Sequence, residues 1–408
     1  MAAIEMELKL SETEAQTFNL EKAVCSHGLF MMAPNIWDPL SKTLLRPLLL
    51  DSREAGYGDG DGISDPKSSS AFVRISHSPS SPDRLNLSIS GVESLSPKQQ
   101  QFLQDQVKRM LRLSETDEQN VRNFQNLHEE SKVNGFGRVF RSPTLFEDMV
   151  KCILLCNCQW SRTLTMAHSL CELQYELHHS TEKLRIEIDH HFAPDTPGAK
   201  ELNRKHGRTS IKNKFTEHEG EMDLMDSITL GNFPSPRELA AIDEGYLAKR
   251  CKLGYRASRI SKLAKTIVNG SVRLDQLEEA CVEPSLESYV ELIEQLKGIN
   301  GFGPFTCANT LMCMGFYHVI PTDSETIRHL KQVHGRNSTL RTVAKDVNEM
   351  YNKYAPFQFL AYWSEVWNFY EDWFGKMSEM SHCDYKLITA ANMKPMKKKK
   401  KIKRNVVS

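Results

Sequence analysis

The pattern of apolar and polar positions divides the chain into a shorter region of strand-like segments and a longer region of helical periodicity. Apolar or alternating runs occur at 44-LLRPLLL-50, 71-AFVRIS-76 and 84-RLNLSIS-90, and Gly, Ser, Asp and Pro separate them. Short segments of this kind, bounded by turn residues, predict strands. We therefore expect a leader at residues 1–15, followed by a small N-terminal antiparallel sheet domain at residues 16–95.

Helical periodicity begins at Ser96, where a serine suited to capping precedes Pro97 at the first helical position. Apolar residues then recur on one face as far as residue 113. Further helices are predicted at residues 142–160, 235–250, 256–270 and 355–375. The predicted fold class is therefore α+β, with the sheet packed on a larger, mostly helical domain at residues 96–375.

Two segments lack sustained apolar periodicity. Residues 176–221 are rich in His, Lys, Glu, Asp and Thr, and we expect a flexible insertion there. Residues 376–408 are expected to form a basic, disordered tail, in which Lys394 to Arg404 contain eight cations and no acid. This run is either a solvated end or a nuclear-import address with nonspecific DNA affinity, and its charge density favours the address. The sequence thus predicts a location in the nucleus.

Composition narrows the class of protein. Lys plus Arg and Asp plus Glu both number 52, so net charge gives no indication for or against a nucleic-acid partner. The sequence has no signal segment and no apolar run near the roughly 20 residues that cross a bilayer, so no membrane partner is expected. The ten cysteines are scattered and are interpreted as thiols, without a cluster suited to zinc or iron–sulfur binding.

The segment 286-LESYVELIEQLKGINGFGPFTCANTLMCMGFYHVIPTD-323 contains two amphipathic stretches joined by a turn. In this turn Gly301 and Gly303 flank one residue, and Pro304 starts the second stretch, which predicts a helix-hairpin-helix. The glycines allow a sharp turn and a close approach to a ligand, and the amides that open the second helix suit a phosphate. Such a turn would bind the DNA backbone independently of base sequence. An ordinary helical hairpin is the alternative, because Gly-x-Gly alone is a weak signal.

Asp323 follows Gly303 by 20 residues, after an apolar helix, and opens a further helix in 320-IPTDSETIRHL-330. Together the hairpin, the Gly-x-Gly turn, the apolar helix and Pro-x-Asp resemble the helix-hairpin-helix DNA glycosylases, which include bacterial 3-methyladenine and eukaryotic 8-oxoguanine DNA glycosylases. The resemblance spans about residues 15–375, apart from the insertion. The segments 25-CSHGLFMMAPNIW-37 and 154-LLCNCQW-160 resemble a plant-type branch of that family.

The resemblance implies excision of a flipped, damaged base, with Asp323 as the catalytic carboxylate. An anion beside the anomeric carbon stabilises the positive charge that develops as an N-glycosidic bond breaks, and it can orient water. Asp323 could instead only cap its helix. Bifunctional members carry a lysine where this chain has Phe305, so the resemblance implies a monofunctional enzyme without AP lyase activity. Phe305 belongs either to the base pocket or to the hairpin core.

A flipped base leaves a hole in the duplex and an orphan partner. In 157-NCQWSR-162, the resemblance to the oxoguanine branch makes Asn157 the hole-filling residue and Arg162 a reader of the orphan base. In 252-KLGYRASR-259, Tyr255 matches that branch's wedge and Arg256 a second reading arginine. The alternatives are a solvated Arg256 at a helix start and Tyr255 as a hydrophobic staple.

Three further assignments follow from the resemblance. Gly28, beside His27, lies where family members bring a loop towards the base pocket. Backbone carbonyls of the hairpin often hold a monovalent cation, Na⁺ or K⁺, and the corresponding residues here are Lys297, Ile299 and Phe302. No organic cofactor is implied. The aromatic residues between 357 and 370 are interpreted mainly as core.

The predicted function is a monofunctional DNA glycosylase of base excision repair, acting as a monomer on double-stranded DNA that enters a cleft between two helical lobes. The missing lysine and Phe305 favour alkylated purines, whereas Asn157, Tyr255 and Arg256 point to 8-oxoguanine; on balance the sequence favours alkylated purines. One alternative is a noncatalytic helix-hairpin-helix DNA-binding module. Another is a structural helical scaffold without salt-dependent DNA binding.

Overall fold

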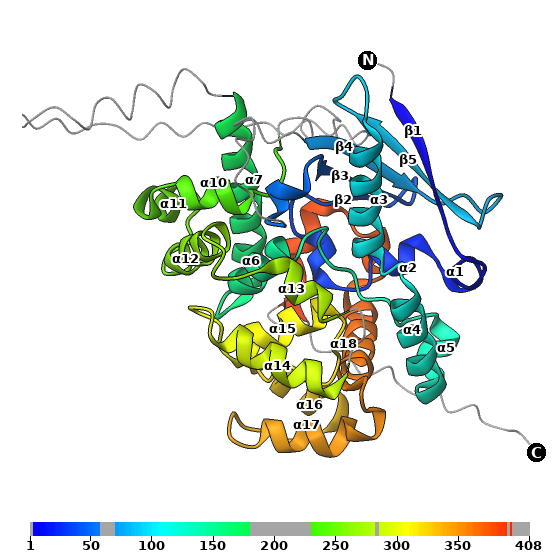
Figure 1. The fold of residues 1–408 in the computed structure, drawn as a ribbon. Coiled ribbons are helices and arrows are strands. Elements are labelled where there is room, and N and C mark those ends of the chain that lie inside the picture. The colour runs from blue at the N-terminus through cyan, green and yellow to red at the C-terminus, as the bar shows by residue number, and fades with distance from the viewer. Residues whose placement is uncertain (1–2, 58–69, 180–229, 282–284, 390–391, 394–408) are drawn as a thin grey trace, which may run out of the picture.

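The computed structural model describes residues 3–57, 70–179, 230–281, 285–389 and 392–393 (Figure 1). An antiparallel five-stranded sheet of order β1-β5-β4-β3-β2 packs beside a much larger helical region. This confirms the α+β prediction. The strands are β1 (Ile4–Lys9), β2 (Ile36–Asp38), β3 (Thr43–Leu49), β4 (Ser70–Ser76) and β5 (Arg84–Ser90).

Period-two alternation explains the central strands. β4 and β5 bury every second side chain, and Val73 faces Ile89 across the pair. α3 (Pro97–Leu111) packs against β3, where the Gln106 side chain exchanges hydrogen bonds of 3.1 and 2.7 Å with the Leu49 backbone. The predicted capping of this helix by Ser96 is confirmed.

The predicted leader at residues 1–15 is wrong, because β1 lies inside it and pairs with β5 from Ile4 to Lys9. β1 is an edge strand in which only Leu8 is buried. An edge strand with so few buried positions gives a weak hydrophobic signal, so its pattern in the sequence was easily missed.

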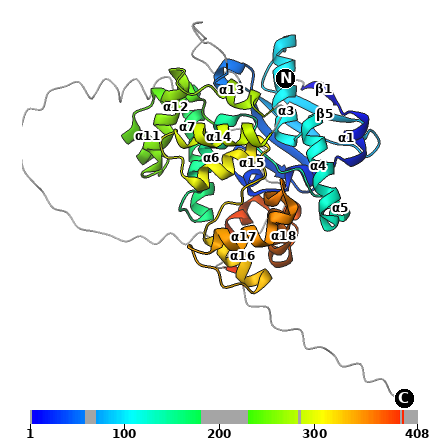
Figure 2. The ribbon, with the colours of Figure 1, turned by 60° about the horizontal axis from the view of Figure 1, so that its bottom comes forward.

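Other helices lie on two sides of the hairpin (Figures 1 and 2). α6, α7, α10, α11 and α12 lie on one side of α14 and α15, and α16, α17 and α18 gather on another. The α-helices beyond α3 are α1 (Glu12–Thr17), α2 (Leu20–Val24), α4 (Glu115–Leu127), α5 (Glu129–Asn134), α6 (Leu145–Leu155), α7 (Trp160–His179), α10 (Pro236–Ala241), α11 (Glu244–Arg250), α12 (Arg256–Val268), α13 (Leu274–Glu279), α14 (Leu286–Lys297), α15 (Pro304–Met314), α16 (Ser324–His334), α17 (Val343–Tyr351) and α18 (Gln358–Phe374). The 3₁₀ helices are η1 (Gly28–Met31), η2 (Ser52–Ala55), η4 (Asn352–Tyr354), η5 (Met377–Glu379) and η6 (His382–Leu387).

Two predicted helices are each divided in the structure. The helix expected at 142–160 is α6 and the start of α7, because Thr144 caps α6 and Asn157 has a left-handed φ of +46° that ends the helical path. The helix expected at 235–250 is α10 and α11, since the Asp243 side chain caps a new helix.

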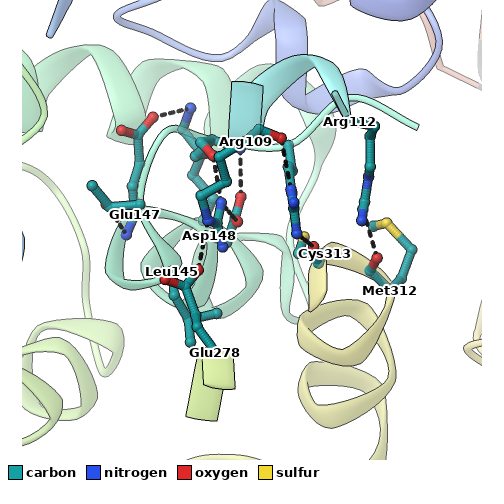
Figure 3. A network of polar contacts seen from close by, with 12 residues as sticks. Arg109, Arg112, Leu145, Glu147, Asp148, Glu278, Met312 and Cys313 are labelled. Atoms are coloured by element: carbon teal, nitrogen blue, oxygen red, sulfur yellow. Dashed lines mark hydrogen bonds and ion pairs between the residues drawn. The ribbon is translucent and has the colours of Figure 1, made fainter. Parts of the chain in front are cut away.

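Buried ion pairs fix the helices beneath the hairpin (Figure 3). Arg109 of α3 lies 2.7 Å from Asp148 of α6 and 2.6 Å from Glu278 of α13. Arg112 and Arg141 each donate a hydrogen bond of 2.8 Å to carbonyls of α15, those of Met312 and Cys313. Two cations at the C-terminal end of α15 stabilise the helix dipole and fix that end of the helix. The first turn of α15 lies at the other end.

The C-terminal residues form part of the domain as far as Thr389, so the predicted tail at 376–408 begins too early. Met377 and Tyr385 are buried. The indole of Trp37 donates to the carbonyl of Ser378 at 2.9 Å, and the indole of Trp160 donates to that of Tyr385 at 2.9 Å.

The lysine run at 394–408 lies outside the described residues, as does the predicted insertion beyond His179, where α7 ends. No helix in the described part of the chain is long and apolar enough to cross a membrane. All ten cysteines are described and free, as expected.

Candidate active site

The predicted helix-hairpin-helix is present as α14, a tight turn and α15. Gly301 has φ +91°, and a Cβ at this position would lie 2.6 Å from the Cδ of Arg259, so both conformation and space require glycine. Gly303 is the N-cap of α15 and provides no side-chain cap. The amides of Phe305 and Thr306 therefore lack an acceptor within their helix and are available to a phosphate.

A cavity of about 700 Å³ opens beside the hairpin. It brings together three of the predicted site residues, Gly28, Phe305 and Asp323, from η1, α15 and the start of α16. Its other lining residues are His27, Leu29, Met31, Met32, Leu155, Cys158, Gln159, Trp160, Ser161, Thr163, Asn309, Pro321, Ser324, Glu325, Thr326, Phe359, Tyr362, Trp363, Trp367, Tyr370, Lys386, Ile388, Thr389 and Asn392. Of the two interpretations of Phe305, the geometry supports the pocket.

Asp323 both caps a helix and faces the cavity. Its Oδ1 accepts a hydrogen bond of 2.9 Å from the Thr326 amide, which is the capping role, and its side chain lines the cavity. Burial raises the pKa of Asp323 above its ordinary value. The two roles are compatible because a carboxylate has two oxygens and one of them is sufficient for the cap.

A second carboxylate at the cavity, Glu325, is already neutralised. The Nε of Arg328 lies 3.0 and 2.9 Å from its two oxygens, and the Tyr370 hydroxyl donates to it at 2.5 Å. No ion pair joins Asp323 to a cation within the described part of the chain. Asp323 is thus the carboxylate whose charge remains available to a cation forming in the cavity.

Aromatic side chains form much of the cavity wall. One of them, Trp160, was not predicted from the sequence. Trp160 packs on Gly28, where an added Cβ would lie 3.2 Å from the indole. Trp363 lies 4.5 Å from the ring of His27, between centroids, and its indole donates to the Ser26 carbonyl at 2.9 Å. Trp363 thus packs against the hydrophobic core and also lines the cavity, whereas Phe357 is buried in the core and does not line it.

His27 is a neutral ring. Burial lowers the pKa of His27 to about 3, and the charge of Arg112 adds to this effect. Its Nδ1 accepts a hydrogen bond of 3.3 Å from the Leu29 amide, which assigns the proton to Nε2.

The turn between α6 and α7 meets the start of α12. Asn157 is exposed at this turn, and Tyr255, 49% exposed, donates from its hydroxyl to the Cys156 carbonyl at 3.2 Å. Arg256 is buried and donates to the carbonyls of Cys156 and Asn157. The prediction that Arg256 reads a base is thus wrong for this structure, because its guanidinium is hydrogen-bonded to the backbone of the turn that presents Asn157. Tyr255 is too exposed for a hydrophobic staple.

Arg259, which the sequence analysis did not select, lies between Tyr255 and the hairpin. Its guanidinium carbon is 4.6 Å from the centroid of the Tyr255 ring, and its stem packs on Gly301. It forms no hydrogen bond or ion pair with any described residue. The spacing of Arg259 in the sequence could have indicated this position, since a residue four positions after Tyr255 lies on the same face of the helix. Arg162 lies near the same turn, with an Nη2 3.4 Å from the Lys252 carbonyl.

The predicted cation site of the hairpin stays a prediction. The carbonyl of Ile299 accepts a hydrogen bond of 3.1 Å from the Phe302 amide, which leaves one of its lone pairs for an ion. Lys297 ends α14 immediately before the turn.

No family model and no curated protein matches the sequence. Among solved structures, the chain is similar to MBOgg1 in complex with a low-affinity DNA ligand, with TM-score 0.44 and 16% identity over 79% of this chain and 96% of that one. It is similar to the 8-oxoguanine glycosylase/lyase of Clostridium acetobutylicum in its apo form, with TM-score 0.42 and 14% identity over 81% and 98% of the chains. The complex of that enzyme with DNA containing cytosine opposite 8-oxoguanine gives TM-score 0.42 and 13% identity over 80% and 96%. These likenesses are distant and do not by themselves assign a function.

Proposed function

We propose that this protein is a monofunctional DNA glycosylase of base excision repair, which hydrolyses the N-glycosidic bond of a flipped, damaged base. The observation that carries the proposal is the un-neutralised carboxylate of Asp323 in an aromatic-walled cavity directly beside a helix-hairpin-helix. The hairpin amides would bind a phosphate, and Asp323 would stabilise the sugar cation and orient the attacking water.

The residues around the cavity support base flipping. Asn157 projects from the α6–α7 turn, and Tyr255 braces that turn through its hydroxyl. We infer that Asn157 fills the hole, that Tyr255 acts as a wedge and that Arg162 faces the orphan base. Arg256 supports them indirectly by holding the Asn157 carbonyl at 3.2 Å.

Alkylated purines are the proposed substrates. Trp160, Phe305 and Trp363 offer aromatic faces, and an alkylated purine that carries positive charge is attracted to such faces more strongly than a neutral base. 8-Oxoguanine is the second candidate, because the segments that carry Asn157 and Tyr255 resemble that branch of the family. A noncatalytic DNA-binding module would need Asp323 only as the cap of α16, and it would give no reason for a carboxylate without a cation partner among the described residues at the cavity.

No lyase step is proposed, because Phe305 occupies the position of the family's nucleophilic lysine. The one lysine among the described residues that line the cavity is Lys386, which is exposed. The enzyme is further proposed to act as a monomer in the nucleus, and the hairpin is proposed to hold Na⁺ or K⁺.

Duplexes that each carry one lesion, with each partner base in turn, test this proposal. The expected result is release of 3-methyladenine or 7-methylguanine and none of 8-oxoguanine. Release of 8-oxoguanine alone would move the assignment to the second candidate. Release of no base from any duplex, with DNA binding intact, would favour the binding module.

A further inference from the structure

A cluster of histidine, glutamate and tyrosine joins α16, α17 and α18, at the end of α16 away from the cavity. The Nε2 of His329 and the Nε2 of His334 lie 3.2 and 2.7 Å from the same Oε2 of Glu365. The Tyr351 hydroxyl donates to that oxygen at 2.5 Å. The two imidazoles and the carboxylate offer donor atoms that all lie within 4.8 Å of one another.

Three polar atoms converge on one oxygen of this cluster. The Nε2 of His329, the Nε2 of His334 and the Tyr351 hydroxyl all lie within hydrogen-bond distance of Glu365 Oε2. The ring of His329 is completely buried, so its Nε2 is held in place beside Glu365.

The donor set is one that zinc and similar ions prefer. Two imidazole nitrogens and a carboxylate oxygen are common ligands of Zn²⁺, at bond lengths of about 2.0–2.2 Å. Tetrahedral geometry with such bonds places ligand atoms about 3.3 Å apart. The His329–Glu365 separation of 3.2 Å is near this value, whereas the His334–Glu365 separation of 2.7 Å is shorter and would have to widen. The side chain of His334 is 26% exposed, so it has room to adjust and gives an ion access from solvent.

We propose that His329, His334 and Glu365 bind a divalent transition-metal ion of the zinc class, with the Tyr351 hydroxyl or a water molecule as the fourth ligand. The site is distinct from the cavity and does not rest on the proposed function. Asp323 and His334 stand at opposite ends of α16, about 16 Å apart along the helix axis. The ion is therefore structural: it fixes α16 to α18 and thereby holds the helix that begins at Asp323.

Cobalt provides a direct probe, because Co²⁺ in a tetrahedral site of nitrogen and oxygen ligands absorbs visible light. The full chain is freed of metal with a chelator and titrated with Co²⁺ and then with Zn²⁺. The expected result is one Co²⁺ per chain with a tetrahedral spectrum, displacement by Zn²⁺, and a higher Tm with either ion. An unchanged spectrum and an unchanged Tm in the wild-type protein would overturn the proposal.

The matched variants are His334→Gln and His178→Gln, because His178 also pairs with a single glutamate, Glu238, at 2.6 Å. His334→Gln should weaken Co²⁺ binding by more than about 100-fold, since loss of a second-shell partner alone weakens metal sites by about 10–100-fold. Its Tm should not rise when Co²⁺ or Zn²⁺ is added. His178→Gln should bind Co²⁺ as the wild-type protein does. Equal Co²⁺ affinity in His334→Gln and wild-type protein would show that this cluster is not the metal site.

Discussion

The indole of Trp160 lies directly against Gly28, so closely that a Cβ at residue 28 would approach the ring to 3.2 Å. This contact joins η1 to the start of α7 and forms one wall of the cavity that contains Asp323. It explains in physical terms why the segments 25–37 and 154–160, distant in sequence, contribute to one site.

Gly28→Ala should therefore displace the Trp160 ring and lower kcat/KM for excision by about 10–100-fold, because small displacements of positioning groups can cost about 100-fold. Affinity for undamaged DNA should change little, since the contact lies within the base cavity. Single-turnover excision and DNA titration measure the two effects. The double variant Gly28→Ala with Trp160→Phe should recover part of the loss because the smaller ring leaves room for the methyl group. A Gly28→Ala enzyme as active as wild type would show that this wall does not position the base.

A buried triad of Arg46, Glu147 and Lys151 predicts the acid sensitivity of the fold. Glu147 lies 2.9 Å from Arg46 and 2.7 Å from Lys151. Although burial acts to raise the pKa of Glu147, Arg46 and Lys151 lower it from 4.5 to about 2. The stabilisation is therefore complete above the unfolded value of 4.5 and is lost as the pH falls from there towards 2.

Glu147→Gln should lower the free energy of unfolding by about 3–5 kcal/mol at neutral pH, because it leaves two buried cations without a counter-charge. It should also flatten the pH dependence between 4.5 and 2, as measured by urea unfolding at a series of pH values. The exposed pair of Lys376 and Glu379 supplies the control, and Glu379→Gln should change stability by less than about 1 kcal/mol. An equally small change for Glu147→Gln would contradict the claim that Glu147 neutralises two buried cations.

The position of Arg259 predicts that this residue contributes measurably to the affinity for DNA. Its guanidinium stacks on Tyr255 beside the hairpin turn, where a bound phosphate would lie. Arg259→Ala should weaken DNA binding uniformly across sequences and reduce the slope of log K against log salt by about 1. Arg84→Ala on β5, remote from the hairpin, should leave the slope unchanged. An unaltered slope for Arg259→Ala would exclude this phosphate contact.

The state of the DNA strand after base excision tests whether the enzyme lacks a lyase nucleophile. The product should be an intact abasic strand, cut only after alkali or endonuclease treatment, and borohydride should trap no covalent adduct. Lys297 precedes the turn, Lys331 lies beyond Asp323, and Lys386 stands at the cavity. A trapped adduct that disappears only in Lys386→Ala would identify that residue as an unexpected nucleophile. An adduct that persists without all three lysines would show that the nucleophile has been misjudged.

The sequence predicted the elements whose signals are local. Strands β3 to β5, the capped helix α3 and the Gly301–Gly303 turn all follow from alternation, capping residues or glycine spacing. β1 was missed because an edge strand buries few side chains. Arg256 was assigned to a base because the sequence does not show that its guanidinium is covered by the turn of α6 and α7. Trp160 and Trp363 were not assigned to the cavity because helical spacing does not distinguish a side chain in the core from one at a cavity wall.

The measurement that tests the central claim most directly is excision by Asp323→Asn. Burial raises the pKa of Asp323, so its ionisation at neutral pH opposes folding, and asparagine removes that charge while it still caps α16. The variant should have an equal or higher Tm and wild-type affinity for DNA, but its excision rate should fall by at least about 100-fold. Asp275→Asn, at the start of α13 and away from the cavity, serves as the control and should excise normally. A folded, DNA-binding Asp323→Asn protein that excises bases at the wild-type rate would contradict the claim that Asp323 is the catalytic carboxylate.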